Sequence, residues 1–201
     1  PLEYVLGEIA FFGCRMKIDS RVLIPRPETE ILVEKIAKQI RGGVLWDLCT
    51  GSGCIGIALK KALPALQVTL SDVSCEALIL AAENAKANSV DVSIVQGDLF
   101  APFKGEKADY IVCNPPYLSE VEYLSLDASV KDFEPKLALV GGVEGVEFYK
   151  RFEREMGAYL RPHAQVFFEI GATQGQALKQ IFPTGELQSD WAGLPRFFTV
   201  G

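Results

Sequence analysis

A glycine-rich segment that follows a short apolar run constrains the fold of this chain more than any other feature. Residues 44–48 are apolar except for Asp47, and the segment 47–56 places Gly51, Gly53 and Gly56 in the spacing GxGxxG. A helical pattern follows directly. Glycine adopts positive φ and lets other groups approach the backbone closely, so this spacing between a strand and a helix is typical of turns that bind a cofactor carrying a ribose. The segment therefore predicts the first unit of a parallel α/β sheet.

The rest of the chain alternates between strand-like and helical patterns. Short apolar runs are separated by stretches with apolar residues at helical spacing, an order typical of βαβ units with helices on both faces of a parallel sheet. Two apolar segments at the end, separated by a Gly-Leu-Pro turn, predict an antiparallel finish. We expect an α/β fold with a mostly parallel, doubly wound sheet: strands at 44–48, 68–70, 92–95, 110–113, 166–170, 186–190 and 196–200, and helices at 54–62, 74–88, 144–160 and 173–182.

Residues 1–42 predict an accessory segment ahead of the sheet. Alternation in residues 15–18 indicates a small hairpin or arm, and apolar residues at helical spacing after Pro27 indicate a helix that ends at Gly42. We therefore divide the chain into an arm with its helix, residues 1–42, which packs on the main domain, and a cofactor-binding catalytic domain, residues 43–201. Residues 118–140 are less regular, and we expect a loop-rich crossing with a short helix there.

Composition narrows the classes of protein and of site. The 201 residues carry a formal net charge of −6 without a run of lysine or arginine, which argues against a surface that binds nucleic acid through its phosphates. No apolar stretch reaches the ~20 residues of a membrane span. Five cysteines without CxxC spacing predict free thiols in a reducing cytoplasm. A single histidine, His163, leaves too few of the usual ligands for a metal site, and we expect none.

Two carboxylates near the glycine turn indicate which cofactor it takes. Asp72 ends the second predicted strand, roughly twenty residues past the turn, where an acidic side chain can accept hydrogen bonds from ribose hydroxyls. Asp47 lies just before the turn, and neither lysine nor arginine lies between Asp47 and Gly51. A pyrophosphate needs amide or basic donors there, whereas the sulfonium and amino groups of S-adenosylmethionine are positively charged. The pattern favours S-adenosylmethionine over NAD, although Asp47 also fits a carboxylate that only accepts N–H bonds within the turn.

The fourth predicted strand ends in Asn114-Pro115-Pro116-Tyr117. Two prolines cannot extend a strand ladder, and a residue before proline is restricted to extended geometry, so Asn114 is held stiffly. Its position beyond the carboxyl end of a strand predicts that it shares a cleft with the glycine turn. The Asn114 side-chain carbonyl and the backbone carbonyl of the adjoining proline offer two acceptors for an NH₂ group, and Tyr117 offers an aromatic face. That arrangement would position an amide nitrogen for methyl transfer without a general base.

These motifs together resemble a known family. Residues 114–117, with residues 47–53 upstream, are similar to the amino-group methyltransferases that use S-adenosylmethionine, which include DNA adenine, RNA guanine and protein glutamine enzymes. Further motifs narrow the resemblance to the peptide chain release factor glutamine N5-methyltransferases, the HemK or PrmC family. They are residues 23–30 (Leu-Ile-Pro-Arg-Pro-Glu-Thr-Glu), 133–135 (Phe-Glu-Pro), 137–139 (Leu-Ala-Leu), Gly141-Gly142, Gly145 with Phe148-Tyr149, and Glu169-Ile170-Gly171. The match covers nearly the whole chain.

The resemblance implies a Rossmann-like class I methyltransferase fold, S-adenosylmethionine as cofactor with S-adenosylhomocysteine as product, and class 1 release factors as the protein partner. The acceptor would be the side-chain amide nitrogen, N5, of the glutamine in their Gly-Gly-Gln loop. Residues 49–53 would line the methionine part of the cofactor, Asp72 its ribose, and Asp98 with Leu99 its adenine. The expected catalytic residues are Asn114, Pro115, Pro116 and Tyr117, and the expected cofactor-binding residues are Asp47, Cys49, Thr50, Gly51, Ser52, Gly53, Asp72, Asp98, Leu99 and Asn114.

Some features depart from the family pattern. Cys49 stands where glycine is usual, and Leu99 where an aromatic residue is common. Family members usually carry an N-terminal helical domain ahead of a segment like residues 1–7. Because this chain begins at Pro1 without a methionine, we expect a fragment without that domain. Alternative acceptors on the same fold are a ribosomal-protein glutamine or an exocyclic amine of a nucleic acid; alternative classes are an NAD-linked oxidoreductase and a binding module without activity.

Overall fold

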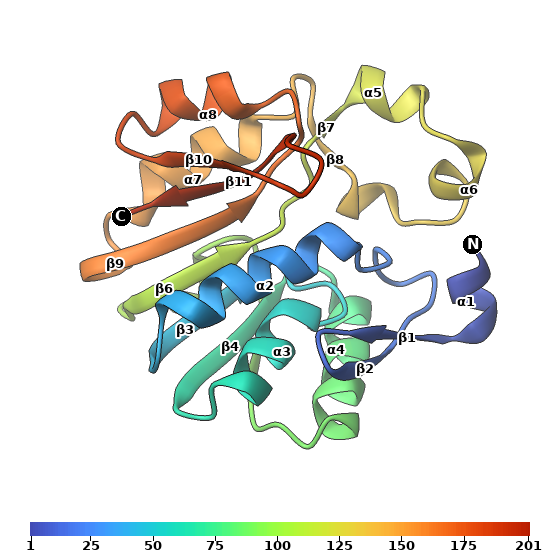
Figure 1. Cartoon of the computed structure of the whole chain (residues 1–201), viewed down its shortest axis with the longest axis horizontal. Helices are drawn as coiled ribbons and strands as arrows, with labels where there is room; N and C mark the ends of the chain where they lie inside the picture. The colour runs from blue at the N-terminus through green and yellow to red at the C-terminus, as the bar shows by residue number, and fades with distance from the viewer.

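The computed structural model describes all 201 residues and places seven strands in one central sheet with helices on both faces (Figure 1). The strands are β3 (Gly43–Leu48), β4 (Leu66–Asp72), β5 (Ser93–Gln96), β6 (Ala108–Cys113), β9 (Leu160–Glu169), β10 (Glu186–Ser189) and β11 (Pro195–Val200). Their order is β10-β11-β9-β6-β3-β4-β5. Strands β9, β6, β3, β4 and β5 run parallel, and β11 runs antiparallel to both β9 and β10. The predicted doubly wound α/β sheet with an antiparallel C-terminal pair is confirmed.

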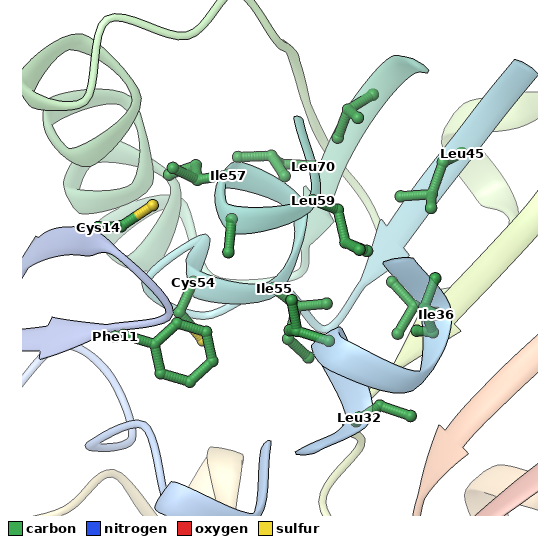
Figure 2. Close-up of a cluster of buried hydrophobic side chains, with 14 of the residues drawn as sticks. Phe11, Cys14, Leu32, Ile36, Leu45, Cys54, Ile55, Ile57, Leu59 and Leu70 are labelled. Carbon is green, nitrogen blue, oxygen red and sulfur yellow. The ribbon is translucent and has the colours of Figure 1, made fainter. Parts of the chain in front are cut away.

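Successive residues of the central strands face opposite helical layers. The helices of these layers are α2 (Pro27–Gln39), α3 (Cys54–Ala62), α4 (Cys75–Ala87), α7 (Glu147–Met156) and α8 (Gly175–Ile181). Leu45 of β3 packs in a cluster with α2, α3 and α4, whereas the next residue, Trp46, packs in a cluster with α7 and α8. Side chains alternate along a strand, so a strand buried on both faces has a continuous apolar run. Figure 2 shows the first cluster, in which side chains of α2, α3, β3 and β4 point toward one another.

The N-terminal arm contains the predicted hairpin, formed by β1 (Glu8–Phe11) and β2 (Cys14–Lys17). It begins with a short helix that the sequence analysis did not anticipate, α1 (Leu2–Leu6), which has no buried residue. A buried asparagine of α4, Asn84, fixes the arm: its Oδ1 accepts a hydrogen bond from the Lys17 N–H (2.7 Å), and its Nδ2 donates to the Lys17 carbonyl (3.0 Å). The same Nδ2 donates to the Ser52 carbonyl (2.9 Å), so one side chain connects the arm to the glycine turn.

Residues 118–142 hold more structure than the predicted loop with one short helix. They form β7 (Leu118–Ser119), α5 (Glu120–Leu124), α6 (Ala128–Lys131), a turn of 3₁₀ helix (Lys136–Ala138) and β8 (Val140–Gly142). Strands β7 and β8 pair in parallel as a small separate sheet. In Figure 1 this segment extends beside the main sheet and ends shortly before α7 begins at Glu147.

One predicted boundary is wrong. The helix expected at 144–160 ends at Met156, and the strand expected at 166–170 begins at Leu160. Tyr159 continues the helical spacing of Phe148 and Phe152, and residues 161–165 (Arg-Pro-His-Ala-Gln) lack the apolar alternation of a strand, so the pattern alone did not show where the strand begins. Pro162 lies inside β9, at the register shift where Ala108 of β6 opposes Leu160 and the next pair starts several residues on. Such irregularities are the places where a strand accepts proline.

Phe168 of β9 is fully buried, and its ring packs against Tyr149, Phe152 and Phe182. We expect Phe168→Ala to lower the free energy of unfolding by about 3–5 kcal/mol, because it removes a large ring and leaves a cavity. Urea unfolding measures the change. Phe133→Ala is the matched control, since that ring is 56% exposed, and it should change stability by no more than ~0.5 kcal/mol. Equal losses in the two variants would contradict the assigned core.

Candidate functional site

A cleft with a cavity volume of about 240 Å³ opens beyond the carboxyl ends of β3, β4 and β6. These are the strand ends that carry the glycine turn, Asp72 and Asn114, so the two predicted motifs meet in one cleft, as expected for a parallel sheet. The predicted site residues on its wall are Cys49, Thr50, Gly51, Ser52, Asp72, Asp98, Leu99, Asn114 and Pro116. Those that do not line it are Asp47, Gly53, Pro115 and Tyr117.

Positive φ angles shape the turn after β3. Cys49 (φ 55°), Gly51 (φ 54°) and Gly53 (φ 82°) all lie in the left-handed region, which is strained for the cysteine. A Cβ atom on Gly51 would meet no other atom within 4 Å, so the backbone there borders the open space of the cleft. On Gly53 it would lie 2.8 Å from Ile57 Cδ1, so this glycine permits α3 to start close against the turn.

A buried carboxylate supports this turn from beneath. Asp47 is 0% exposed; its Oδ2 accepts hydrogen bonds from Thr50 Oγ1 (2.6 Å) and from the Gly56 N–H (2.8 Å). Its Oδ1 is buried without a hydrogen-bond partner. Burial raises the pKa of Asp47 to about 7, in opposition to the two hydrogen bonds, which lower it. Asp47 therefore joins β3 to the turn and to α3 and does not reach the cleft wall.

Asp72 ends β4 and holds the turn from the other side. Its Oδ2 accepts from the Gly51 N–H (2.9 Å) and its Oδ1 from the Ser74 N–H (2.9 Å). Burial raises the pKa of Asp72, while these backbone hydrogen bonds lower it. Ser74 in turn caps α4 by accepting from the Ala77 N–H (3.2 Å). The carboxylate is thus fixed between two backbone donors on the wall of the cleft, with further lone pairs available to a ligand.

The segment 114–117 leaves β6 at the same end of the sheet. Asn114 and Pro116 line the cleft, whereas Pro115 is buried beneath them. The Tyr117 ring also lies off the cleft wall, where burial raises the pKa of its hydroxyl to about 12. The Asn114 side chain is therefore the polar group of this segment that is open to a ligand.

Asp98 and Leu99 lie where the chain turns after β5. Both oxygens of Asp98 accept hydrogen bonds from Arg151 Nη1 of α7 (2.8 and 2.7 Å). Leu99 has a positive φ of 53° and packs into the cluster under α7, with its edge on the cleft. Val73 also lines the cleft and is 48% exposed, and sequence reasoning missed it. The signal was its place directly after Asp72, at the carboxyl end of β4.

Two further parts of the wall were not assigned from the sequence. They come from the arm (Arg21, Val22, Leu23, Pro25) and from the segment after α6 (Pro135, Leu137, Ala138). Glu134 joins these two segments: its buried carboxylate accepts from the Ile24 N–H (3.0 Å) and from Arg26 Nη2 (2.5 Å). Residues 23–30 and 133–139 both carry motifs of the family that the sequence resembles, but nothing in the spacing of residues within either segment indicates that the two segments meet.

No group of three or more His, Cys, Asp or Glu side chains is arranged to hold a metal ion. The five cysteines are free thiols. None of the helices combines the length and the hydropathy that crossing a bilayer requires.

The raised pKa of Asp47 makes stability depend on pH. An aspartate in the unfolded chain titrates near pH ~3.9, so between that pH and about 7 the folded protein keeps a proton that the unfolded chain has lost. The free energy of unfolding of the wild type should therefore fall across this range relative to that of Asp47→Asn. Urea unfolding at a series of pH values measures this difference, and the exposed Asp91→Asn should follow the wild type. Parallel curves for wild type and Asp47→Asn would contradict the raised pKa.

Comparisons with known proteins agree with this geometry. The family model described as methyltransferase small domain matches residues 26–130. Among curated proteins, the release factor glutamine methyltransferase of Chlamydia trachomatis serovar D is 45% identical over 98% of this chain and 71% of its own length. The same enzyme of Thermodesulfovibrio yellowstonii is 39% identical over 98% of this chain and 74% of the relative's length. That of Bacillus cereus is 40% identical over 90% of this chain and 67% of the relative's length.

Solved structures share the fold. A methyltransferase from Pyrococcus furiosus has a TM-score of 0.69 at 18% identity, covering 94% of this chain and 89% of its own. A methyltransferase in complex with S-adenosylhomocysteine has a TM-score of 0.64 at 14% identity; the match covers 96% of this chain and 55% of the chain in that structure. These likenesses show a class I methyltransferase fold. With the sequence relatives, they establish that the chain belongs to the release factor glutamine methyltransferase family and is an S-adenosylmethionine-dependent methyltransferase.

Proposed function

We propose that this chain transfers a methyl group from S-adenosylmethionine to the side-chain amide nitrogen of the glutamine in the Gly-Gly-Gln motif of class 1 release factors. One observation carries the proposal: Asn114, placed stiffly at the end of β6, lies on the same cleft wall as the glycine turn and Asp72. A site for an amide and a site for a ribose-bearing cofactor are therefore adjacent. The family to which the chain belongs supplies the identity of the acceptor protein.

The cleft fits the cofactor. Open space beside Gly51 lets a ligand approach the turn backbone, and the Asp72 carboxylate retains lone pairs for two ribose hydroxyls. Lysine is absent from the wall, and the one arginine there, Arg21, is paired with Asp19 (2.7 Å), so nothing on it resembles a pyrophosphate site. In this proposal residues 49–53 hold the methionine part, Asp72 the ribose, and Asp98, Leu99 and Val73 the adenine.

Asp47 contributes to cofactor binding indirectly, through the turn. Its carboxyl group lies beneath the turn, so it sets the turn's shape, and in its ionised form it adds negative potential under the site. Bound S-adenosylmethionine supplies an electrophilic methyl group on a positively charged sulfonium. Negative potential below the turn favours that charge, which is the opposite of what a phosphate requires.

The acceptor is activated by position and by hydrogen bonding. The amide nitrogen of glutamine is a poor nucleophile because its lone pair is delocalised into the carbonyl. In this proposal the Asn114 side-chain carbonyl accepts one of its N–H bonds on the cleft wall, and the backbone carbonyl of Pro115, a residue just behind that wall, accepts the other. These two bonds favour a pyramidal nitrogen and direct the lone pair at the methyl carbon. The proton leaves after transfer, when the nitrogen is cationic and strongly acidic, so no general base is needed.

We place the reaction in the cytoplasm, where free thiols persist and release factors act. In this scheme residues 43–201 form the S-adenosylmethionine-binding catalytic domain, and residues 1–42 form an arm that completes the cleft through Arg21, Val22, Leu23 and Pro25.

Two measurements test the proposal. Isothermal titration should show binding of S-adenosylmethionine and S-adenosylhomocysteine and none of NAD. Transfer of a radiolabelled methyl group should then occur to a class 1 release factor and not to the same factor with the acceptor glutamine changed to alanine. Ribosomal proteins, DNA and RNA serve as competing acceptors. Labelling of one of these in place of the release factor would overturn the substrate assignment.

Asn114→Ala should abolish methyl transfer and keep the dissociation constant for S-adenosylmethionine within a few-fold of the wild-type value, because the main role proposed for this side chain, which also borders the cofactor, is on the acceptor. Single-turnover transfer and isothermal titration give the two quantities. If the variant loses cofactor binding as well, Asn114 belongs to the cofactor site and the assignment fails.

Asp72→Ala should weaken cofactor binding by ~1–3 kcal/mol, the range expected when charge-assisted hydrogen bonds are removed. Isothermal titration against Asp91→Ala, an exposed aspartate outside the cleft, separates this effect from a general loss of negative charge. A dissociation constant equal to that of the wild type would exclude Asp72 from the ribose site.

A further inference from the structure

Two glycines pack closely against the backbone at the end of the acceptor motif, residues 114–117. A Cβ atom on Gly141 would collide with the carbonyl oxygen of Pro116, and one on Gly145 would collide with the carbonyl oxygen of Tyr117. Only residues without a side chain fit at these positions. The path of the motif is therefore restricted by its neighbours as well as by its own prolines.

One buried side chain holds the same backbone by hydrogen bonds. Gln174, which precedes α8, is 7% exposed. Its Nε2 donates to the carbonyl oxygens of Tyr117 (2.7 Å) and Gly145 (2.9 Å), and its Oε1 accepts from the Gly171 N–H (2.9 Å). A single amide thus connects the acceptor motif after β6, the loop before α7 and the segment after β9.

The chemistry of these three contacts requires a primary amide. Two carbonyl acceptors need two N–H donors on one atom, and the third contact needs an acceptor on the same planar group. A carboxylate offers no donor, and an apolar side chain removes the partner of three backbone groups, of which the Gly145 carbonyl makes a buried bond and the other two make part-buried ones. Gln174 is itself fixed, because its backbone N–H donates to the Gly171 carbonyl (3.0 Å) and its carbonyl accepts from the Leu178 N–H (3.0 Å).

We propose that Gln174 is a positioning residue for methyl transfer. Through its bond to the Tyr117 carbonyl it sets the orientation of the peptide that ends the acceptor motif, and so the direction in which Asn114 and Pro115 present their carbonyl oxygens. The inference rests on the proposed function, in which those two oxygens hold the acceptor amide. Gln174 is off the cleft wall, so it acts through the motif and not on a ligand.

The test compares Gln174→Met, which keeps the length of the side chain and removes all three hydrogen bonds, with Gln176→Met, the same change at an exposed position of α8. Enzyme concentration is set by titrating cofactor sites, so partial unfolding does not enter the rate. We expect Gln174→Met to lower kcat for release factor methylation by about 10- to 100-fold, as for a small misplacement of reacting groups. The dissociation constant for S-adenosylmethionine and the activity of Gln176→Met should stay at wild-type values.

Gly145→Ala provides a second test, since a Cβ atom there would displace the Tyr117 carbonyl while the Gln174 side chain is left unchanged. It should give the same fall in kcat with cofactor affinity retained, and it replaces Gln174→Met if that variant does not fold. Wild-type kcat in either folded variant, or a parallel loss of cofactor affinity, would overturn the inference. Failure of the wild type to methylate the release factor would overturn the proposed function instead. A crystal structure of Gln174→Met with an unmoved Tyr117 peptide would overturn the positioning role independently of any activity.

Discussion

The hydrogen bonds that Asp47 accepts from Thr50 and Gly56 fix the turn on which the rest of the cleft is built. They join a central strand, the turn and the helix after it, so the backbone beside Gly51 and the start of α3 have one arrangement. Asp72 then fixes Gly51 from the neighbouring strand. Burying the Asp47 carboxyl group with one unpartnered oxygen costs folding free energy. The fold tolerates this cost because many other contacts around the group offset it. The apolar layers on both faces of β3 provide them.

The sequence predicts the part of the site at the strand ends well, because the sequence signals for that part are local. Gly51 and Gly53 mark a turn whose φ angles glycine adopts most easily, and Asp72 follows at the end of the next strand. Asn114 is held by the prolines next to it. In a parallel sheet such strand ends lie at one edge, so three separate motifs predict one cleft without any knowledge of side-chain contacts. The cofactor roles of these residues remain predictions that the binding experiments address.

The remaining parts of the site depend on contacts that no short pattern encodes. Glu134 and Ile24 lie 110 residues apart, and neither segment is periodic. Gln174 sits at the start of a helix whose spacing predicts only α8, while its amide reaches Tyr117, 57 residues earlier. The helix–strand boundary near Leu160 was misplaced for a related reason, because residues 161–165 show no strand-like alternation and the irregularity that admits Pro162 exists only in the pairing with β6. Long-range packing decided each of these features.

The Glu134 contacts also imply an order in which the enzyme becomes complete. The glycine turn, Asp72 and Asn114 all precede β7 in the sequence, whereas the wall formed with the arm requires Glu134, and the acceptor motif acquires its last hydrogen bonds from Gln174. A chain emerging from the ribosome, N-terminus first, therefore presents the glycine turn, Asp72 and Asn114 before the segments that enclose the cleft have been synthesised. Asp98 and Leu99 also need α7, to which Asp98 is hydrogen-bonded and against which Leu99 packs, so the cleft is complete only once the C-terminal part of the chain has folded.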